Sequence, residues 1–371
     1  MPVRLFVMLC LIVFGCTEPT EPRFQLEEPF YLVEGDIADQ PDFSEIRISR
    51  SRFSNVQLTL EQVTDAAVTT TEALSGEVVI WSHDPERPGT YIPPPGFVAQ
   101  SGEVWSATVS FPDGSRVVSL PERLPDPVDV EGLRVVFDQE GEYDRARRIF
   151  VPLFRILLDY TDPAGTANSY QWDFRYWEEE FVCATCIGGV YRGGSCIARP
   201  VGSGQDSRYD YACAGEETCF QQTRGHQFKY GSDRAFNGSS VRGQEIGTIE
   251  FTTYGGLLVE GILYSLTAEA YNYGRVVADI VEGNSGLNAT IPAALIGNMR
   301  DPDNEDRQVL GFVRAVSVAT QRRYLLRDVA TGTPSPNPTV INYEPPVGLF
   351  VPPRAPCRGE GRSPGKPAGW P

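Results

Sequence analysis

The most reactive side chains in this chain are its eight cysteines, six of which lie beyond residue 180. These six are Cys183, Cys186, Cys196, Cys213, Cys219 and Cys357. An even set of thiols in an exported chain predicts a disulfide framework, whose pairing the sequence leaves open. A zinc cluster built on Cys183-Ala-Thr-Cys186 is the alternative, but exported thiols are oxidised and no second regular CxxC follows. A thioredoxin-like redox motif would need a βαβ context, whereas the flanks here are rich in glycine.

The other two cysteines belong to the start of the chain, which has the pattern of an export signal. A single cation, Arg4, precedes an apolar run over residues 5–14, and Gly15 ends it. The run is too short to span a bilayer, which needs roughly 20 apolar residues. Cys16, directly after the small residue, resembles the lipobox cysteine of bacterial lipoproteins, which is diacylated and becomes the new N-terminus. We therefore expect residues 1–15 to be a lipoprotein signal peptide and Cys16 to anchor the mature chain to a membrane.

Catalytic chemistry has few candidates in this sequence. The two histidines, His83 and His226, both lie in segments with loop composition. The run Glu178-Glu-Glu180 could supply paired carboxylates for glycoside hydrolysis, but consecutive strand residues point to alternate faces, so a solvated charge run is favoured. No GxSxG elbow, HExxH helix or phosphate-binding glycine loop occurs. We expect neither catalytic residues nor a cofactor.

Asp301, Asp303 and Glu305 are the candidate metal ligands. Ca²⁺ takes several hard oxygen ligands, and alternating carboxylates can offer them. The run lacks the spacing and the glycine of an EF-hand loop. An acidic turn without metal is therefore favoured, and calcium is the alternative.

Four aromatic residues occupy every second position in one stretch: Tyr170, Trp172, Phe174 and Tyr176. Side chains at this spacing share one face of a strand. Because aromatic rings dominate core burial, a sheet face packed on the core is the favoured interpretation. The alternative is a platform on which sugars or aromatic ligands stack.

The elements that would position these residues are mostly strands. Apolar residues alternate over 105–111 and resume at 117–118 after a Pro-Asp-Gly-Ser turn, which predicts a hairpin. Residues 154–160 also alternate, and an Asp-Pro-Ala-Gly turn then leads to the aromatic stretch, which predicts a second, long hairpin. One helix is predicted over residues 267–282, with Thr267 as its N-cap.

Shifts in composition divide the chain into segments. Residues 16–23, with two Glu-Pro pairs, form a tether. Residues 24–125 carry short strand patterns at the spacing of an antiparallel β-sandwich, and a Pro-rich break follows. Residues 126–371 form a second β-rich domain. Within it, residues 183–219 hold five of the six downstream cysteines and few apolar residues, so cross-links would hold this insert.

The charge balance excludes two classes of partner. The chain has 32 basic and 49 acidic residues, a net charge of −17. Nucleic-acid binding needs clustered Lys and Arg, so we expect no nucleic-acid partner. Adsorption to anionic lipid through a basic patch is disfavoured for the same reason. Membrane attachment would depend on the acyl chains.

Several segments, in order, resemble the Bacteroidota lipoproteins of the domain-of-unknown-function family DUF4249. After the anchor cysteine and tether come FYLVEGDIADQPDFSEIRISRS and GEVWSATVSFPDGSRVVS, and then LDYTDPAGTANSYQWDFRYW and SLTAEAYNYGRVVADI. The ending CRGEGRSPGKPAGW is similar to the family's ending, except that a second nearby cysteine is missing. If Cys357 pairs, its partner must therefore come from residues 183–219.

The resemblance and the strand patterns together predict a mainly β chain. An N-terminal antiparallel β-sandwich, immunoglobulin-like or prealbumin-like, would precede a second β-rich domain with one helix and a disulfide-held loop region. The resemblance implies a surface-facing outer-membrane lipoprotein, often accompanied by a TonB-dependent transporter, and it carries over no catalytic residue.

We expect a non-enzymatic protein that captures a ligand or partner for such a transporter. The alternatives are a structural or adhesive surface module that binds protein or glycan, and a secreted hydrolase. Pockets concentrate at domain junctions, so a ligand site is expected there or beside the aromatic strand and the cysteine-rich insert.

Overall fold

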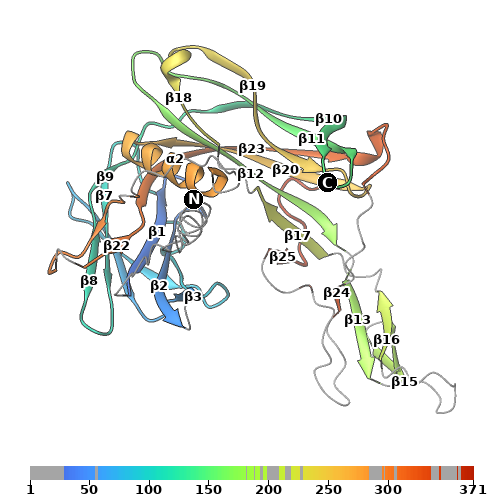
Figure 1. Cartoon of the computed structure of the whole chain (residues 1–371), viewed down its shortest axis with the longest axis horizontal. Coiled ribbons are helices and arrows are strands. Elements are labelled where there is room, and N and C mark those ends of the chain that lie inside the picture. The colour runs from blue at the N-terminus through green and yellow to red at the C-terminus, as the bar shows by residue number, and fades with distance from the viewer. Residues whose placement is uncertain are drawn as a thin grey trace, which may run out of the picture.

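The computed structural model describes residues 29–54, 57–180, 182–187, 189–192, 195–198, 209–213, 219–225, 229–283, 295, 297–304, 307–335, 342–343, 357 and 361–371. Within these residues the chain is mainly β with one α-helix, which confirms the predicted fold class. Two β regions lie side by side, and helix α2 (Ala268–Gly283) lies where they meet (Figure 1).

The first region is a β-sandwich with one apolar core. One sheet contains β1 (Tyr31–Ala38), β2 (Glu45–Ser54), β3 (Gln57–Gln62) and β6 (Thr90–Ile92). The other contains β4 (Ala67–Glu72), β5 (Val78–His83), β7 (Val104–Ser110), β8 (Arg116–Ser119) and β9 (Glu122–Arg123). Val33 and Ile48 from the first sheet and Trp105 and Val109 from the second fill the core. The hairpin predicted around residue 113 is confirmed as β7 and β8.

Strands from late in the sequence complete this first sandwich. β21 (Met299–Arg300) pairs with β8, and β22 (Val309–Leu310) runs parallel to β1. The first part of β23 (Val313–Leu326) also pairs parallel with β1. The rest of β23 pairs antiparallel with β20 (Gly256–Leu266) of the second region. A single long strand therefore belongs to both regions and fixes one against the other.

The second region is a sandwich of two sheets. In the inner sheet, β12 (Ser169–Glu180) pairs with β20 on one edge and with β17 (Cys219–Arg224) and β18 (Lys229–Ser232) on the other. The outer sheet contains β10 (Val130–Asp144), β11 (Ile149–Thr161) and β19 (Ser240–Glu250).

The predicted long hairpin between residues 154–160 and the aromatic stretch is wrong. β11 takes its backbone partners from β10 and β19, whereas β12 takes its partners from the inner sheet. The two strands instead pack face to face, and the rings of Tyr160 and Tyr170 lie 5.5 Å apart across the core between the sheets. Alternation identified both strands, but it carried no information about which strands pair.

Helix α2 covers the other face of the inner sheet. It begins one residue after Thr267, whose Oγ1 accepts a hydrogen bond from the Ala270 N–H at 3.1 Å, so the predicted N-cap is present. Ala270 and Tyr273 face the apolar outer side of β20 and β23. Gly274 permits close approach to the sheet, because a Cβ there would lie 2.5 Å from the ring of Tyr230.

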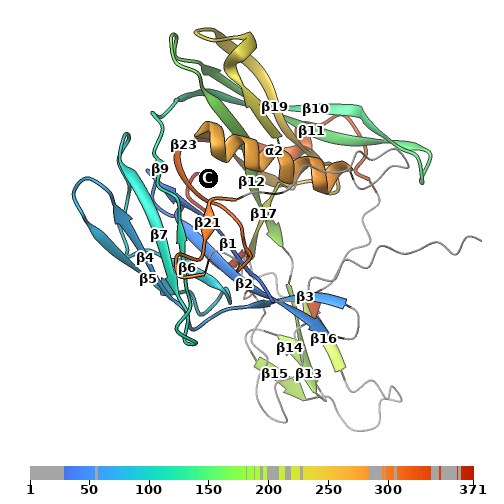
Figure 2. The same ribbon diagram turned by 60° about the vertical axis from the view of Figure 1, so that its left-hand side comes forward.

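A narrow arm projects away from both sandwiches (Figures 1 and 2). It contains β13 (Val182–Ile187), β14 (Gly189–Arg192), β15 (Ser195–Ala198), β16 (Tyr209–Cys213) and β24 (Asn342–Tyr343). The backbone register of β13 and β16 sets Cys183 opposite Cys213. The remaining short elements are η1 (Asp233–Ala235), η2 (Arg327–Val329) and β25 (Arg362–Ser363).

Candidate ligand site at the domain junction

A cavity of about 610 Å³ lies where the first sandwich meets α2. One wall is formed by residues 120–121, which follow β8, and by β9, and a second wall by the first turns of α2. Residues 297–298, directly before β21, and Phe312, directly before β23, line it as well. Small-molecule sites usually have volumes of about 300–1,000 Å³, so this cavity is large enough for a small organic ligand.

Glu122 is the buried ionisable group of this cavity. It lies opposite Trp105 of β7 in the register, and alternation along β9 turns Glu122 inward and Arg123 outward. The residue is only 6% exposed. The hydroxyl of Thr267 donates a hydrogen bond of 2.7 Å to its Oε2 atom. Since Thr267 also caps α2, one hydroxyl connects the helix start to the edge of the first sandwich.

The environment changes the acidity of this carboxyl. Burial raises the pKa of Glu122 to about 7, the Thr267 hydrogen bond opposes the rise, and the nearby Glu269 carboxylate adds to it. Near neutral pH both protonation states are therefore populated. The protonated form can donate a hydrogen bond, and the carboxylate can bind a cation.

The rest of the cavity combines apolar walls with a polar mouth. Leu120, Val276 and Phe312 supply apolar surface. Arg123 and Glu269 are exposed at the edge, and neither forms an ion pair within the described part of the chain. Apolar walls with a few polar groups are typical of small-molecule sites.

A second cavity, which lies beside β12 and is lined mainly by polar groups, is much smaller. Its volume is about 40 Å³, and Asp36, Asp173 and Arg224 are among the residues around it. Burial raises the pKa of Asp173 to about 6. Beside it, the Arg314 guanidinium binds both carboxylate oxygens of Asp36 at 2.6 and 2.7 Å. Water fits this space but an organic ligand does not. Arg314 also donates a hydrogen bond of 2.6 Å to Gln171 of β12, so we assign this space to the contact between the two regions.

The aromatic residues of β12 lie in the core. Tyr170, Trp172 and Phe174 are 0%, 5% and 4% exposed, and Tyr176 is partly buried against the same cluster. A ring enclosed on both faces has no surface left on which a ligand can stack. Tyr170, Trp172 and Phe174 therefore belong to a sheet face packed on the core, and they offer no platform on which a ligand could stack.

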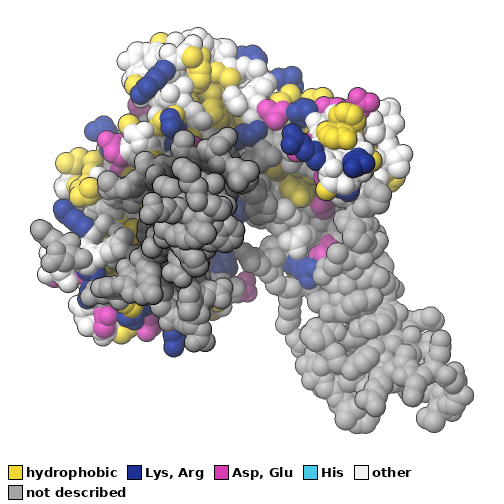
Figure 3. Space-filling view, in the orientation of Figure 1, with side chains coloured by type: hydrophobic (Ala, Val, Ile, Leu, Met, Phe, Trp, Pro, Cys, Tyr) yellow, Lys and Arg dark blue, Asp and Glu magenta, His cyan; other side chains and the backbone are white. Residues whose placement is uncertain are grey.

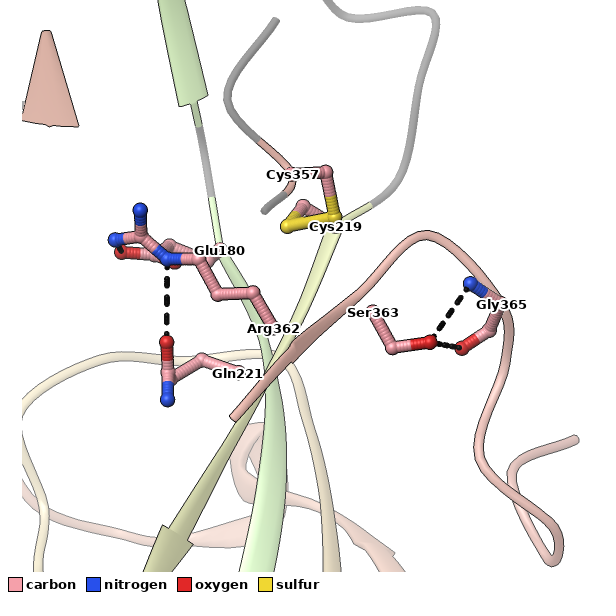
Figure 4. The surroundings of a disulfide bond; sticks show 7 residues. All are labelled: Glu180, Cys219, Gln221, Cys357, Arg362, Ser363 and Gly365. Atoms are coloured by element: carbon pink, nitrogen blue, oxygen red, sulfur yellow. Dashed lines mark hydrogen bonds and ion pairs between the residues drawn. A yellow bond between two sulfur atoms is a disulfide. The ribbon is translucent and has the colours of Figure 1, made fainter. Parts of the chain in front are cut away.

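Cys219 and Cys357 form a disulfide, with 5.5 Å between their Cα atoms. The bond joins the C-terminal segment to the start of β17, where Arg362 also contacts Gln221 and Glu180 (Figure 4). Cys357 thus takes its partner from residues 183–219, as expected.

The other cysteines are described only in part or not at all. Cys183, Cys186, Cys196 and Cys213 lie on strands of the arm, and their side chains are outside the described set. Cys16 lies wholly outside the described residues.

The acidic run at residue 301 is a turn. The Oδ1 atom of Asp301 accepts hydrogen bonds from the backbone N–H groups of Asp303 and Asn304, and its Oδ2 lies 3.1 Å from Arg307. Both oxygens thus have protein partners, as in an acidic turn without metal; Glu305 lies outside the described residues, so the calcium alternative stays untested. No cluster of His, Cys, Asp and Glu within the described ranges could hold a metal ion.

The other candidate catalytic residues have structural contacts. Glu178 forms an ion pair with the buried Arg327, and Glu180 with Arg362. The ring of His83 packs edge-on against Tyr91 at 5.5 Å. His226 lies outside the described residues.

Sequence reasoning did not identify Glu122. It stands between Pro121 and Arg123 in a Pro-rich stretch that has the composition of a linker. A glutamate between a proline and an arginine has the sequence pattern of an exposed residue, so the sequence does not predict that Glu122 is buried. Its burial arises from contact with Thr267, 145 residues away, and only the tertiary structure shows this contact.

Comparison with known proteins gives a family but no activity. Residues 17–322 match the family model described as Domain of unknown function (DUF4249). No curated protein matches the chain. Among the described residues, no helix is long and apolar enough to cross a membrane.

Proposed function

The chain belongs to the DUF4249 family, and on this premise we propose that it is a lipid-anchored outer-membrane protein that captures a small ligand at the junction cavity. In this proposal the protein faces the cell surface and delivers the ligand to a TonB-dependent transporter. No bond is made or broken in the ligand.

The observation that carries the proposal is the buried Glu122 carboxyl at the wall of a preformed cavity. A carboxyl with a strongly perturbed pKa in a concave, largely apolar site is a physical marker of a functional site. Strands of the first sandwich and the capped start of α2 hold the two walls in place, so ligand binding would need little ordering of the protein.

The anchor and the partner rest on the sequence. The apolar run before Cys16 and the tether after it support lipidation and export. The TonB-dependent partner comes from the family resemblance. On the face shown in Figure 3, acidic and basic side chains of the described residues occur on several elements, with apolar side chains between them.

A hydrolase is the second candidate, because Glu122 and Glu269 line one cavity and their carboxyls differ in environment. A buried acid beside an exposed carboxylate is the arrangement used for acid–base catalysis. Turnover of chromogenic glycosides or esters that Glu122→Gln abolishes would support this candidate. A structural or adhesive module predicts, instead, that the soluble chain binds surface proteins or glycans independently of Glu122.

A pull-down in mild detergent tests the transport proposal. The native lipidated protein is isolated beside a Cys16→Ala version, and the recovered proteins are identified by mass spectrometry. We expect a stoichiometric TonB-dependent barrel with the lipidated protein. A lipidated monomer recovered without any barrel would contradict the transport role.

A further inference from the structure

Six acidic residues are almost completely enclosed in the described part of the chain, and one of them has fewer partners than the other five. They are Glu72, Glu122, Asp162, Asp233, Glu260 and Asp301. Glu260 binds two arginines, and Asp301 binds one arginine and two backbone N–H groups.

The remaining buried acids, Glu122 excepted, accept at least two hydrogen bonds each. Glu72 accepts from the N–H groups of a turn, Asp162 from a tyrosine hydroxyl and a backbone N–H, and Asp233 from a backbone N–H and an asparagine amide. Glu122 has a single donor in the described residues, the hydroxyl of Thr267. A buried carboxylate with so little compensation is costly in the folded state.

The geometry points to a ligand that supplies the missing charge. We propose that the junction cavity binds a small amphipathic organic cation, whose primary ammonium group contacts Glu122 and whose apolar body lies against Leu120, Val276 and Phe312. The inference rests on the proposed function, since it names the ligand class that the cavity would capture.

An ammonium group fits this site better than an anion. The Oε1 atom of Glu122 has no hydrogen-bond donor among the described residues, and Glu269 adds a second negative charge on the cavity edge. Although a helix N-terminus attracts anions, the Ala270 N–H of α2 is already bonded to Thr267. Arg123 also lines the edge, but it is exposed and turned outward along β9. The two carboxylates therefore outweigh it and would repel a carboxylate or phosphate ligand.

Binding of such a cation depends on pH through Glu122. The ionisable side chains that line the cavity with it are Glu269 and Tyr273 of α2 and Arg123 of β9. Burial raises the pKa of Tyr273, so it stays protonated, and β7 presents no ionisable residue along its length. With a pKa of about 7, the carboxylate fraction of Glu122 rises about tenfold between pH 6 and pH 8. The affinity for an ammonium ligand should therefore rise about tenfold over this range.

Isothermal titration calorimetry with three probes of one chain length tests the inference. Hexylammonium, 1-hexanol and hexanoate are titrated into the mature chain carrying Cys16→Ala, at pH 6 and pH 8. We expect hexylammonium to bind at least tenfold more tightly than the other two at pH 8, and about tenfold more weakly at pH 6 than at pH 8. Buffers of different ionisation enthalpy should reveal proton release on binding near pH 7.

Two variants locate the effect. Glu122→Gln, which keeps the shape of the side chain, should lose at least tenfold in hexylammonium affinity and all of its pH dependence. Glu86→Gln, a change at an exposed glutamate that does not line the cavity, should bind as the parent does. Far-ultraviolet circular dichroism checks that each variant is folded.

Three other outcomes of these titrations would each contradict the ammonium assignment, and they can be told apart. Binding of 1-hexanol or hexanoate as tight as that of hexylammonium leaves ligand capture standing but removes the cation. Hexylammonium binding that survives Glu122→Gln places the amine elsewhere. If no probe binds, the ammonium assignment fails. The transport role would still stand in that case, because it fails only if the pull-down recovers the lipidated protein without a barrel.

Discussion

Replacement of Glu122 by glutamine should make the protein more stable at alkaline pH. The glutamine side chain has the same shape and can still accept the Thr267 hydrogen bond through its carbonyl oxygen. It carries no charge at any pH. The variant therefore removes the destabilising ionisation of a buried carboxyl and keeps the rest of the contact.

The magnitude follows from the pKa. Burial raises the pKa of Glu122 from its ordinary value of 4.5 to about 7. The folded state then holds the proton more tightly than the unfolded state, so its stability falls as the pH rises from about 4.5 to about 7. A pKa change of about 2.5 at about 1.4 kcal/mol for each pH unit gives a destabilisation of about 3 kcal/mol, fully developed above pH 7.

Urea unfolding at pH 5 and pH 8, followed by tryptophan fluorescence, measures this effect. We expect Glu122→Gln to exceed the parent in free energy of unfolding by about 3 kcal/mol at pH 8 and by about 1 kcal/mol at pH 5. Any packing cost of the amide is the same at both pH values, so the change of about 2 kcal/mol between them is diagnostic. Glu86→Gln is the control and should show no such change. The reasoning would be refuted if the variant and the parent differed in free energy of unfolding by the same amount at both pH values. It would also be refuted if the variant were less stable than the parent at pH 8 but not at pH 5.

Three further changes test the framework around the site. Cys219→Ser should lower the free energy of unfolding by about 2–5 kcal/mol in urea titrations, because it opens the disulfide to Cys357; dithiothreitol should destabilise the parent more than the variant. Glu260→Gln should cost about 3 kcal/mol, since it leaves two arginines without their shared buried partner, and an unchanged urea midpoint would contradict this. Gly247→Ala should cost about 1–3 kcal/mol, because its Cβ would lie 2.1 Å from the Phe174 ring; adding Phe174→Leu should restore part of the loss.

Local patterns predicted the strands and the helix of this protein well. Alternation over residues 105–111 matches the buried positions Trp105, Ala107 and Val109 of β7. The Thr267 N-cap placed the start of α2 to within a residue. These features depend on neighbours in the sequence, which is why the sequence reveals them.

Contacts between distant segments were not predictable in the same way. The parallel pairing of β23 with β1 joins residues more than 270 apart, as the Asp36–Arg314 ion pair with its separation of 278 shows. Nothing in the local pattern of either strand specifies that partner. The same holds for Glu122, whose burial depends on the start of α2. Alternation also could not show that β11 and β12 face each other across a core instead of pairing.

The most direct test of the junction site is the titration of the Glu122 carboxyl itself. The carboxyl carbon is observed by nuclear magnetic resonance in protein labelled with ¹³C-glutamate, and the signal is assigned by its absence from Glu122→Gln. We predict a pKa of about 7 without ligand and a clear decrease, by about one pH unit or more, in saturating hexylammonium. A pKa near 4.5 without ligand, or a value that hexylammonium leaves unchanged, would contradict the account.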